Sequence, residues 1–162
     1  MTIPAFADPS APFRVLTVVT AEDLPAFLDA SPARDWLKAS GFEAGLGDLR
    51  LIPGGEGVAS AVAGLGTATA RARLRFGLAK AIAGLPAGNW ALEGHLSDAE
   101  RDEAVLAWLL QSYRFDRYRP GKTPAAPVLL RLPEGVDGAR MLAMAEAEFL
   151  TRDLINTPAS SA

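Results

Sequence analysis

The sequence predicts an α/β protein, a three-layer sandwich in which helices cover both faces of a mixed, mostly parallel β-sheet. Short apolar runs rich in β-branched residues alternate with helical patterns along most of the 162 residues. One glycine-rich turn joins two such runs at hairpin distance, which adds an antiparallel pair to the sheet. No internal repeat or low-complexity linker divides the chain, so we expect a single layered domain.

Composition excludes several classes of function. The chain is 49% hydrophobic, yet no apolar run approaches the length of a membrane helix, so no membrane partner is expected. A formal net charge of −3 argues against nucleic acid as a partner. The absence of cysteine excludes disulfides, thiolate metal sites and cysteine nucleophiles. A single histidine, His95, excludes a multi-histidine zinc site.

The first elements follow a short leader. Residues 1–12 contain three prolines and lack the form of a secretory signal, which predicts a loose leader or edge segment and a cytoplasmic location. A single α/β domain is expected over residues 13–155. Arg14–Thr20 predicts a buried strand. Two helices should follow, over Ala21–Ala30 with Thr20 as its cap and over Pro32–Ala39.

The middle of the chain predicts a hairpin and a long helix. Asp48–Pro53 and Gly57–Leu65 are strand-like and are joined by a turn that contains Gly54 and Gly55. Thr67–Leu85 then predicts one continuous helix, whose core face carries Leu74, Leu78, Ile82 and Leu85 at spacings of four, four and three.

The last third predicts two strands and two helices. Asn89–His95 should be a strand, and Ser97 with Glu100 forms a capping box for a helix that is apolar all round from Val105 to Leu110. Pro127–Leu132 is the last predicted strand. Asp137–Ile155 is the final helix, and we expect one of its faces to carry Ala143, Ala147, Leu150 and Leu154.

Two sites can be considered from residue types alone. His95 ends a predicted strand between Glu93 and Asp98, which allows a general base oriented by a carboxylate or a structural hydrogen bond. Glycine-rich turns follow strands where α/β proteins bind phosphates on backbone amides, although neither turn matches a nucleotide-binding motif. The candidate ligand-loop residues are Gly54, Gly55, Gly64 and Gly66.

Three segments carry a resemblance to a known family. Residues 108–119, WLLQSYRFDRYR, resemble the "G-x-Y-x-F-x-x-Y-K" stretch of leucyl (cytosol) aminopeptidases, with Gln111 in place of the usual glycine. Residues 151–159, TRDLINTPA, resemble the family's "ARDLVNTPAN" segment, and Gly64-Leu65-Gly66 is similar to its "GLG" turn. The matching positions are Tyr113, Phe115, Tyr118, Arg152, Asp153, Asn156, Thr157 and Pro158.

The resemblance implies an N-terminal domain without catalytic residues. In this family that domain is similar to a macro-type fold, and a separate C-terminal domain binds two divalent metal ions, zinc or manganese, to remove N-terminal amino acids from peptides. The family's metal-binding stretches, "GKGxxFDxGG" and "NTDAEGR", do not occur here. No catalytic or metal-ligating residue is therefore assigned, and residues 156–162 are expected to begin a linker into a catalytic domain absent from this chain.

Three functional hypotheses follow. The preferred one is a domain for packing, positioning and oligomer assembly, partnered by its own catalytic domain in a homo-oligomer that the resemblance implies is a hexamer. On that hypothesis we expect exposed apolar residues on the last helix, with Met141, Leu142, Phe149 and Ile155 as candidates. The alternatives are a macro-like module that binds a nucleotide or ADP-ribose at the glycine turns, and an independent enzyme that uses His95.

Overall fold

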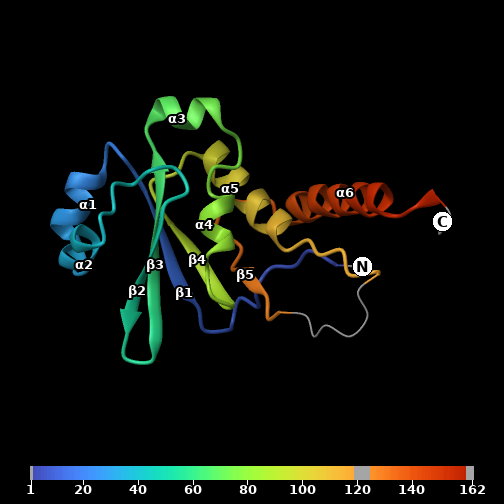
Figure 1. The fold of residues 1–162 in the computed structure, drawn as a ribbon, viewed down its shortest axis with the longest axis horizontal. Coiled ribbons are helices and arrows are strands. Elements are labelled where there is room, and N and C mark those ends of the chain that lie inside the picture. The colour runs from blue at the N-terminus through green and yellow to red at the C-terminus, as the bar shows by residue number, and fades with distance from the viewer. Residues whose placement is uncertain (1, 119–124, 160–162) are drawn as a thin grey trace.

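Five strands form one mixed sheet, in the order β2-β3-β1-β4-β5 (Figure 1). The computed structural model describes residues 2–118 and 125–159. The central strand β1 pairs in parallel with β3 and β4, β4 pairs in parallel with β5, and only β2 is antiparallel, to β3. The mixed, mostly parallel sheet is therefore confirmed. The strands are β1 (Arg14–Thr20), β2 (Leu49–Gly54), β3 (Gly57–Gly66), β4 (Gly88–Gly94) and β5 (Val128–Leu130).

Helices lie on both faces of this sheet, which confirms the α/β sandwich (Figure 1). Side chains of β1 point alternately to the two faces, so Leu16 and Val18 enter the larger core while Val19 enters the smaller one. Helices α1 (Leu24–Ala30) and α2 (Arg34–Ala39) cover the smaller core. The larger core is covered by α4 (Ala79–Ala83), α5 (Asp98–Gln111) and α6 (Gly138–Asn156).

Two tryptophans anchor the larger core. Trp90 on β4 and Trp108 on α5 are almost fully buried. Each indole N–H donates to a backbone carbonyl at 3.0 Å, that of Trp90 to Pro86 O and that of Trp108 to Val128 O. Both large side chains are thus buried without leaving a polar group unpaired.

The N-terminal residues lie along the edge of the sheet. The backbone N–H of Ala7 donates to Leu130 O at 2.9 Å, and the hydroxyl of Thr2 donates to Arg114 O at 2.8 Å. Ala7 is buried. The Ala7 N–H thus adds a backbone hydrogen bond to the outer edge of the short strand β5.

The predicted helix over Thr67–Leu85 is wrong as a single element. The structure has two short helices there, α3 (Ala68–Arg73) and α4, and the residues between them are not helical. Leu78, Ile82 and Leu85 are buried as expected, but Leu74 is 58% exposed. A carboxylate on α5 accounts for the break, since Glu103 Oε1 accepts the Phe76 backbone N–H at 2.8 Å and removes it from helical bonding.

The N-terminal end of α5 agrees with the prediction. Ser97 Oγ accepts the Glu100 backbone N–H at 3.2 Å, and Glu100 Oε2 accepts the Ser97 N–H at 2.9 Å. The first helix begins later than expected, because Thr20 Oγ1 accepts the Asp23 N–H and closes a turn ahead of α1. Within the described residues no helix is both long and apolar enough to cross a membrane.

The orientation of α6 reverses two expectations. Its core face is Met141, Ala145 and Phe149, all nearly inaccessible, so the expected exposure of Met141 and Phe149 is wrong. The predicted apolar face, Ala143, Ala147, Leu150 and Leu154, is exposed. Ile155 is 77% exposed, as expected. Phe149 turns inward because its ring packs against Tyr113, with centroids 5.1 Å apart.

Two adjacent residues of α6 test this orientation. Truncation of the buried Phe149→Ala should lower the free energy of unfolding by about 3–5 kcal/mol. Leu150→Ala, at a residue that is 54% exposed, should change it by less than about 0.5 kcal/mol. Urea denaturation of both variants provides the measurement, and equal losses would contradict the burial of Phe149 with exposure of Leu150.

Candidate functional site

Two of the segments that carry the family resemblance, residues 108–119 and 151–159, meet at one place in the structure. Tyr113 follows the C-terminal end of α5, and Asp153 lies in the last turns of α6. The Tyr113 hydroxyl donates to Asp153 Oδ1 at 2.8 Å and accepts from Asn156 Nδ2 at 3.3 Å. Residues 40 positions apart in sequence are thus joined directly. We call this contact region the α5–α6 junction.

Ring contacts hold the Tyr113 side chain in place within the junction. Its ring lies against Phe149, and the Arg152 guanidinium lies 5.4 Å from the ring centroid. Arg152 Nε also pairs with Glu148 at 2.9 Å, one helical turn earlier. Tyr113 therefore combines apolar packing, a cation–π contact and hydrogen bonds to the last turns of α6.

The surroundings of Tyr113 favour its neutral form. Burial raises the pKa of Tyr113 above the ordinary value of 10.0, and the hydrogen bond and negative charge of Asp153 raise it further. The hydrogen bond from Asn156 and the positive charge of Arg152 act in the opposite direction but do not cancel the increase. The neutral phenol can donate to Asp153, whereas a phenolate would face the carboxylate as a like charge.

The loop after α5 makes further contacts with the end of α6. Arg117 Nη1 donates to Thr157 Oγ1 at 3.3 Å, and that hydroxyl donates to Asp153 O at 2.7 Å. The rings of Phe115 and Tyr118 pack edge to face at 5.8 Å. Pro158 is exposed, and the resemblance continues at Arg119 beyond the described residues.

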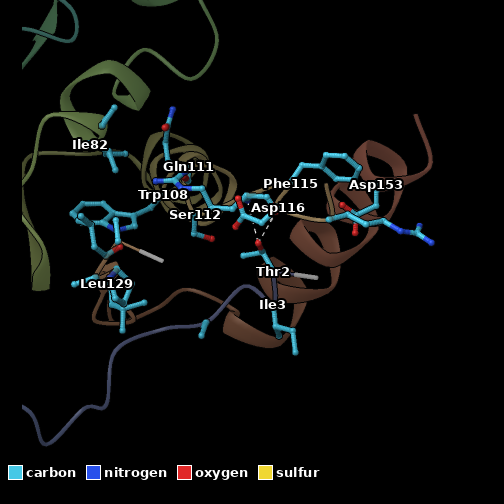
Figure 2. A pocket seen from close by; sticks show the side chains of 18 of the residues that line it. Thr2, Ile3, Ile82, Trp108, Gln111, Ser112, Phe115, Asp116, Leu129 and Asp153 are labelled. Atoms are coloured by element: carbon cyan, nitrogen blue, oxygen red, sulfur yellow. Dashed lines mark hydrogen bonds between the residues drawn. The ribbon is translucent and has the colours of Figure 1, made fainter. Parts of the chain in front are cut away.

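A cavity of about 1070 Å³ lies beside the junction. Figure 2 shows side chains from α5, the N-terminal segment and α6 around it. Ser112 donates its hydroxyl to Leu109 O at 2.6 Å, and no histidine lines the cavity. The described lining therefore contains no nucleophile paired with a histidine base, and its apolar part comes from residues such as Ile3, Trp108 and Phe115.

The structure does not bring the candidate ligand-loop glycines together. Gly54 and Gly55 lie at the hairpin turn, whereas Gly64 and Gly66 lie at the opposite end of β3. The amides at that opposite end are already paired with the chain, because Gly64 N–H donates to Asp48 O and Gly66 N–H to Ala44 O, at 2.8 and 2.9 Å. These two amides are not free to bind a phosphate.

An internal carboxylate lies just after the second glycine turn. Glu22 Oε1 accepts the Ala68 backbone N–H at 2.9 Å, at the first residue of α3. This hydrogen bond is the largest cause that lowers the pKa of Glu22, and Arg71 adds an ion pair at 3.6 Å. A phosphate placed here would have to displace Glu22, which argues against a nucleotide site at this turn.

His95 does not form the arrangement that a general base requires. Its side chain and that of Glu93 are exposed, and Asp98 pairs instead with Arg101 at 3.2 Å. Within residues 2–118 and 125–159, no three histidine, aspartate or glutamate side chains gather as metal ligands. The described residues therefore do not fit a dimetal centre.

Sequence reasoning missed Phe149 as the partner of Tyr113. The spacing of Met141, Ala145 and Phe149 is as helical as that of the outer face, so periodicity alone could not select between the two. Phe149 itself was the signal that could have identified the buried face, because large aromatic rings contribute most to core packing.

Comparisons with known proteins agree with the geometry. A family model described as the N-terminal domain of M17 aminopeptidases matches residues 15–133. The structure is similar to a cytosol aminopeptidase from Coxiella burnetii, with a TM-score of 0.76, 29% identity and coverage of 93% of this chain and 33% of that one.

Two further solved structures extend the comparison. One is the bottromycin maturation enzyme BotP in complex with Mn, with a TM-score of 0.66, 28% identity and coverage of 93% of this chain and 33% of that one. A tomato leucine aminopeptidase mutant shares the fold, with a TM-score of 0.61, 18% identity and coverage of 97% and 39%. No curated protein matches in sequence. The chain thus spans about a third of the length of these solved structures.

Substitution of two glycines separates a structural role from a ligand-binding role. A Cβ at Gly64 would lie 2.1 Å from Gly45 O, whereas one at Gly55 would meet nothing within 4 Å. Gly64→Ala should therefore lower the free energy of unfolding by about 1–3 kcal/mol or more, and Gly55→Ala should leave it nearly unchanged. Thermal and urea unfolding provide the comparison, and an unaffected Gly64→Ala variant would refute the close approach.

Titration of Tyr113 tests the junction. Because its folded pKa is raised, the stability it contributes is fully present below pH 10.0 and is lost as pH rises through the folded value. Tyr118→Phe leaves Tyr113 as the only tyrosine, so tyrosinate absorbance can follow it alone. Asp153→Asn in this background should lower the pKa of Tyr113, because it removes a negative charge that raises that pKa. An unchanged titration would show that Asp153 does not contact Tyr113.

Proposed function

The chain belongs to the M17 aminopeptidase family, and we propose that it is a non-catalytic N-terminal domain that packs against and positions a catalytic domain. The observation that carries this proposal is the outward face of α6. We call Ala143, Ala147, Leu150 and Leu154 the outer stripe. Leu150 and Leu154 are 54% and 68% exposed, and the core face of the same helix is fully packed. A helix with apolar residues on two opposite faces is typical of one that lies between two layers.

The α5–α6 junction supports this role because it fixes the direction of the helix that carries the outer stripe. Tyr113 and Arg117 hold the last turns of α6, close to Leu154 and Ile155. A catalytic domain that followed α6 would therefore begin from a fixed point. The segment from residue 156 onward would then serve as the linker.

The activity of a whole protein of this kind is part of the proposal. We propose that its catalytic domain removes N-terminal amino acids from peptides with two divalent metal ions, zinc or manganese. The support is the family itself and the similarity to BotP, which was solved with Mn. A cytoplasmic homo-oligomer, with a hexamer as in the family, is proposed on the same grounds, and the matched Coxiella burnetii protein is described as a cytosol aminopeptidase.

A chimeric enzyme tests the positioning role. This chain would replace the matched third of the Coxiella burnetii cytosol aminopeptidase, and release of amino acids from a peptide would be measured with manganese or zinc. We expect the chimera to be active and the 162-residue chain alone to release nothing. Metal-dependent turnover by the chain alone would contradict a non-catalytic role.

Substitutions in the outer stripe test whether this surface contacts the catalytic domain. Leu150→Ser with Leu154→Ser should leave the isolated chain stable within about 0.5 kcal/mol, because both side chains are exposed there. In the chimera the same pair should lower the melting temperature and the activity together. Glu146→Ser, an exposed polar position on α6, should do neither. If the paired variant behaved like Glu146→Ser in the chimera, the outer stripe would not be a docking surface.

A further inference from the structure

The connection between β3 and β4 contains a helical pattern that the structure interrupts. Leu78, Ile82 and Leu85 are buried at 4, 2 and 6% exposure, while Leu74, one helical turn earlier, is 58% exposed. In an uninterrupted helix all four side chains would share one face. The sequence thus encodes a longer helix than the one that forms.

The interruption places a bulky residue in an unfavourable backbone conformation. Phe76 has a φ of 55°, in the left-handed region that side chains with a Cβ rarely adopt. Leu74 is extended, with φ −132° and ψ 122°. A continuous helix would relieve the strain at Phe76 and turn Leu74 toward the buried face.

Space lined by apolar residues and by the charged Arg71, Arg75, Glu100 and Glu103 lies beside the present position of Leu74. A cavity of about 570 Å³ lies between this segment and α5. Leu74 itself is part of the lining, with Leu46, Leu65, Leu78, Ala104 and Ala107. Burial of a leucine side chain there would add to the hydrophobic contacts of the larger core.

A single carboxylate contacts the interrupted segment. Glu103 on α5 uses both oxygens, one accepting the Phe76 N–H at 2.8 Å and the other the Arg75 Nε–H at 2.6 Å. The Glu103 side chain is 28% exposed, so these charge-assisted contacts are partly shielded from water. In a continuous helix the Phe76 N–H would instead donate to the backbone carbonyl four residues earlier.

We propose that residues 74–78 are a two-state segment, held in the broken form by Glu103 and able to form a continuous helix that places Leu74 in the cavity. Gly77 suits both forms, because a Cβ there would lie 2.4 Å from Leu46 Cδ1 in the broken form and glycine is still tolerated in a helix. Helix α3 has no buried residue and can move with the segment. Its polar attachments include Arg71 to Glu22, Glu100 and the Gly66 carbonyl, and the Ala68 amide to Glu22.

Carbon chemical shifts of Leu74 to Gly77 in the 162-residue chain test this proposal, independently of the proposed function. Glu103→Ala should move the Leu74 Cα shift from extended toward helical. The ratio of helical to broken form should rise about tenfold or more, as expected for the loss of hydrogen bonds to a charged group. Asp102→Asn, which removes a neighbouring carboxylate of α5 that holds neither Arg75 nor Phe76, should leave the shifts unchanged.

A second substitution shows whether strain at Phe76 drives the change. Phe76→Gly removes that strain, so Glu103→Ala combined with Phe76→Gly should return Leu74 to the extended shift. Glu103→Gln keeps an acceptor for the Phe76 N–H and should give a smaller change in the same direction, which provides the test if Glu103→Ala does not fold. Extended Leu74 shifts in both single variants at Glu103 would overturn the proposal.

Discussion

The packing of Tyr113 against Phe149 ties the buried side of the last helix to the end of α5. Helix α6 has apolar residues on opposite faces, so its own sequence allows either side to be buried. The Tyr113 ring, supplied by the end of α5, selects Phe149, and the Tyr113 hydroxyl then reaches Asp153. With the helix fixed in this rotation, Leu150 and Leu154 remain exposed on the other side. The proposed docking surface therefore lies opposite the face on which Met141, Ala145 and Phe149 are buried.

Helix α5 makes contacts with the rest of the fold at both of its ends and along its middle. Its capped N-terminal end supplies Glu100 and Glu103, which pair with Arg71 and Arg75 on the connection between β3 and β4. Its buried middle packs Trp108 against the sheet, and its C-terminal end leads into Tyr113. The helix thus links the segment that we propose to be two-state to the α5–α6 junction. The two-state segment and the α5–α6 junction both depend on polar side chains on or next to this buried helix.

The sequence predicted the elements of the fold that are determined by residues close together in the chain. The β-branched run of β1 and the capping box at Ser97 are read within a few residues, and the structure reproduces both. The rotation of α6 and the break near Phe76 could not be predicted, because each depends on a side chain from another element, Tyr113 and Glu103 respectively. The resemblance identified Tyr113 and Asp153 separately, and only the fold shows that they bind each other.

The most direct test of the account is the accessibility of the outer stripe in a complete enzyme. The chain contains no cysteine, so Leu154→Cys introduces one thiol, and its alkylation can be followed in the peptide that contains it. The measurement compares the isolated chain with the chimera that carries the Coxiella burnetii catalytic domain. We predict rapid alkylation in the isolated chain and strong protection in the chimera. Equal rates in the two proteins would contradict the claim that α6 packs between this domain and a catalytic one.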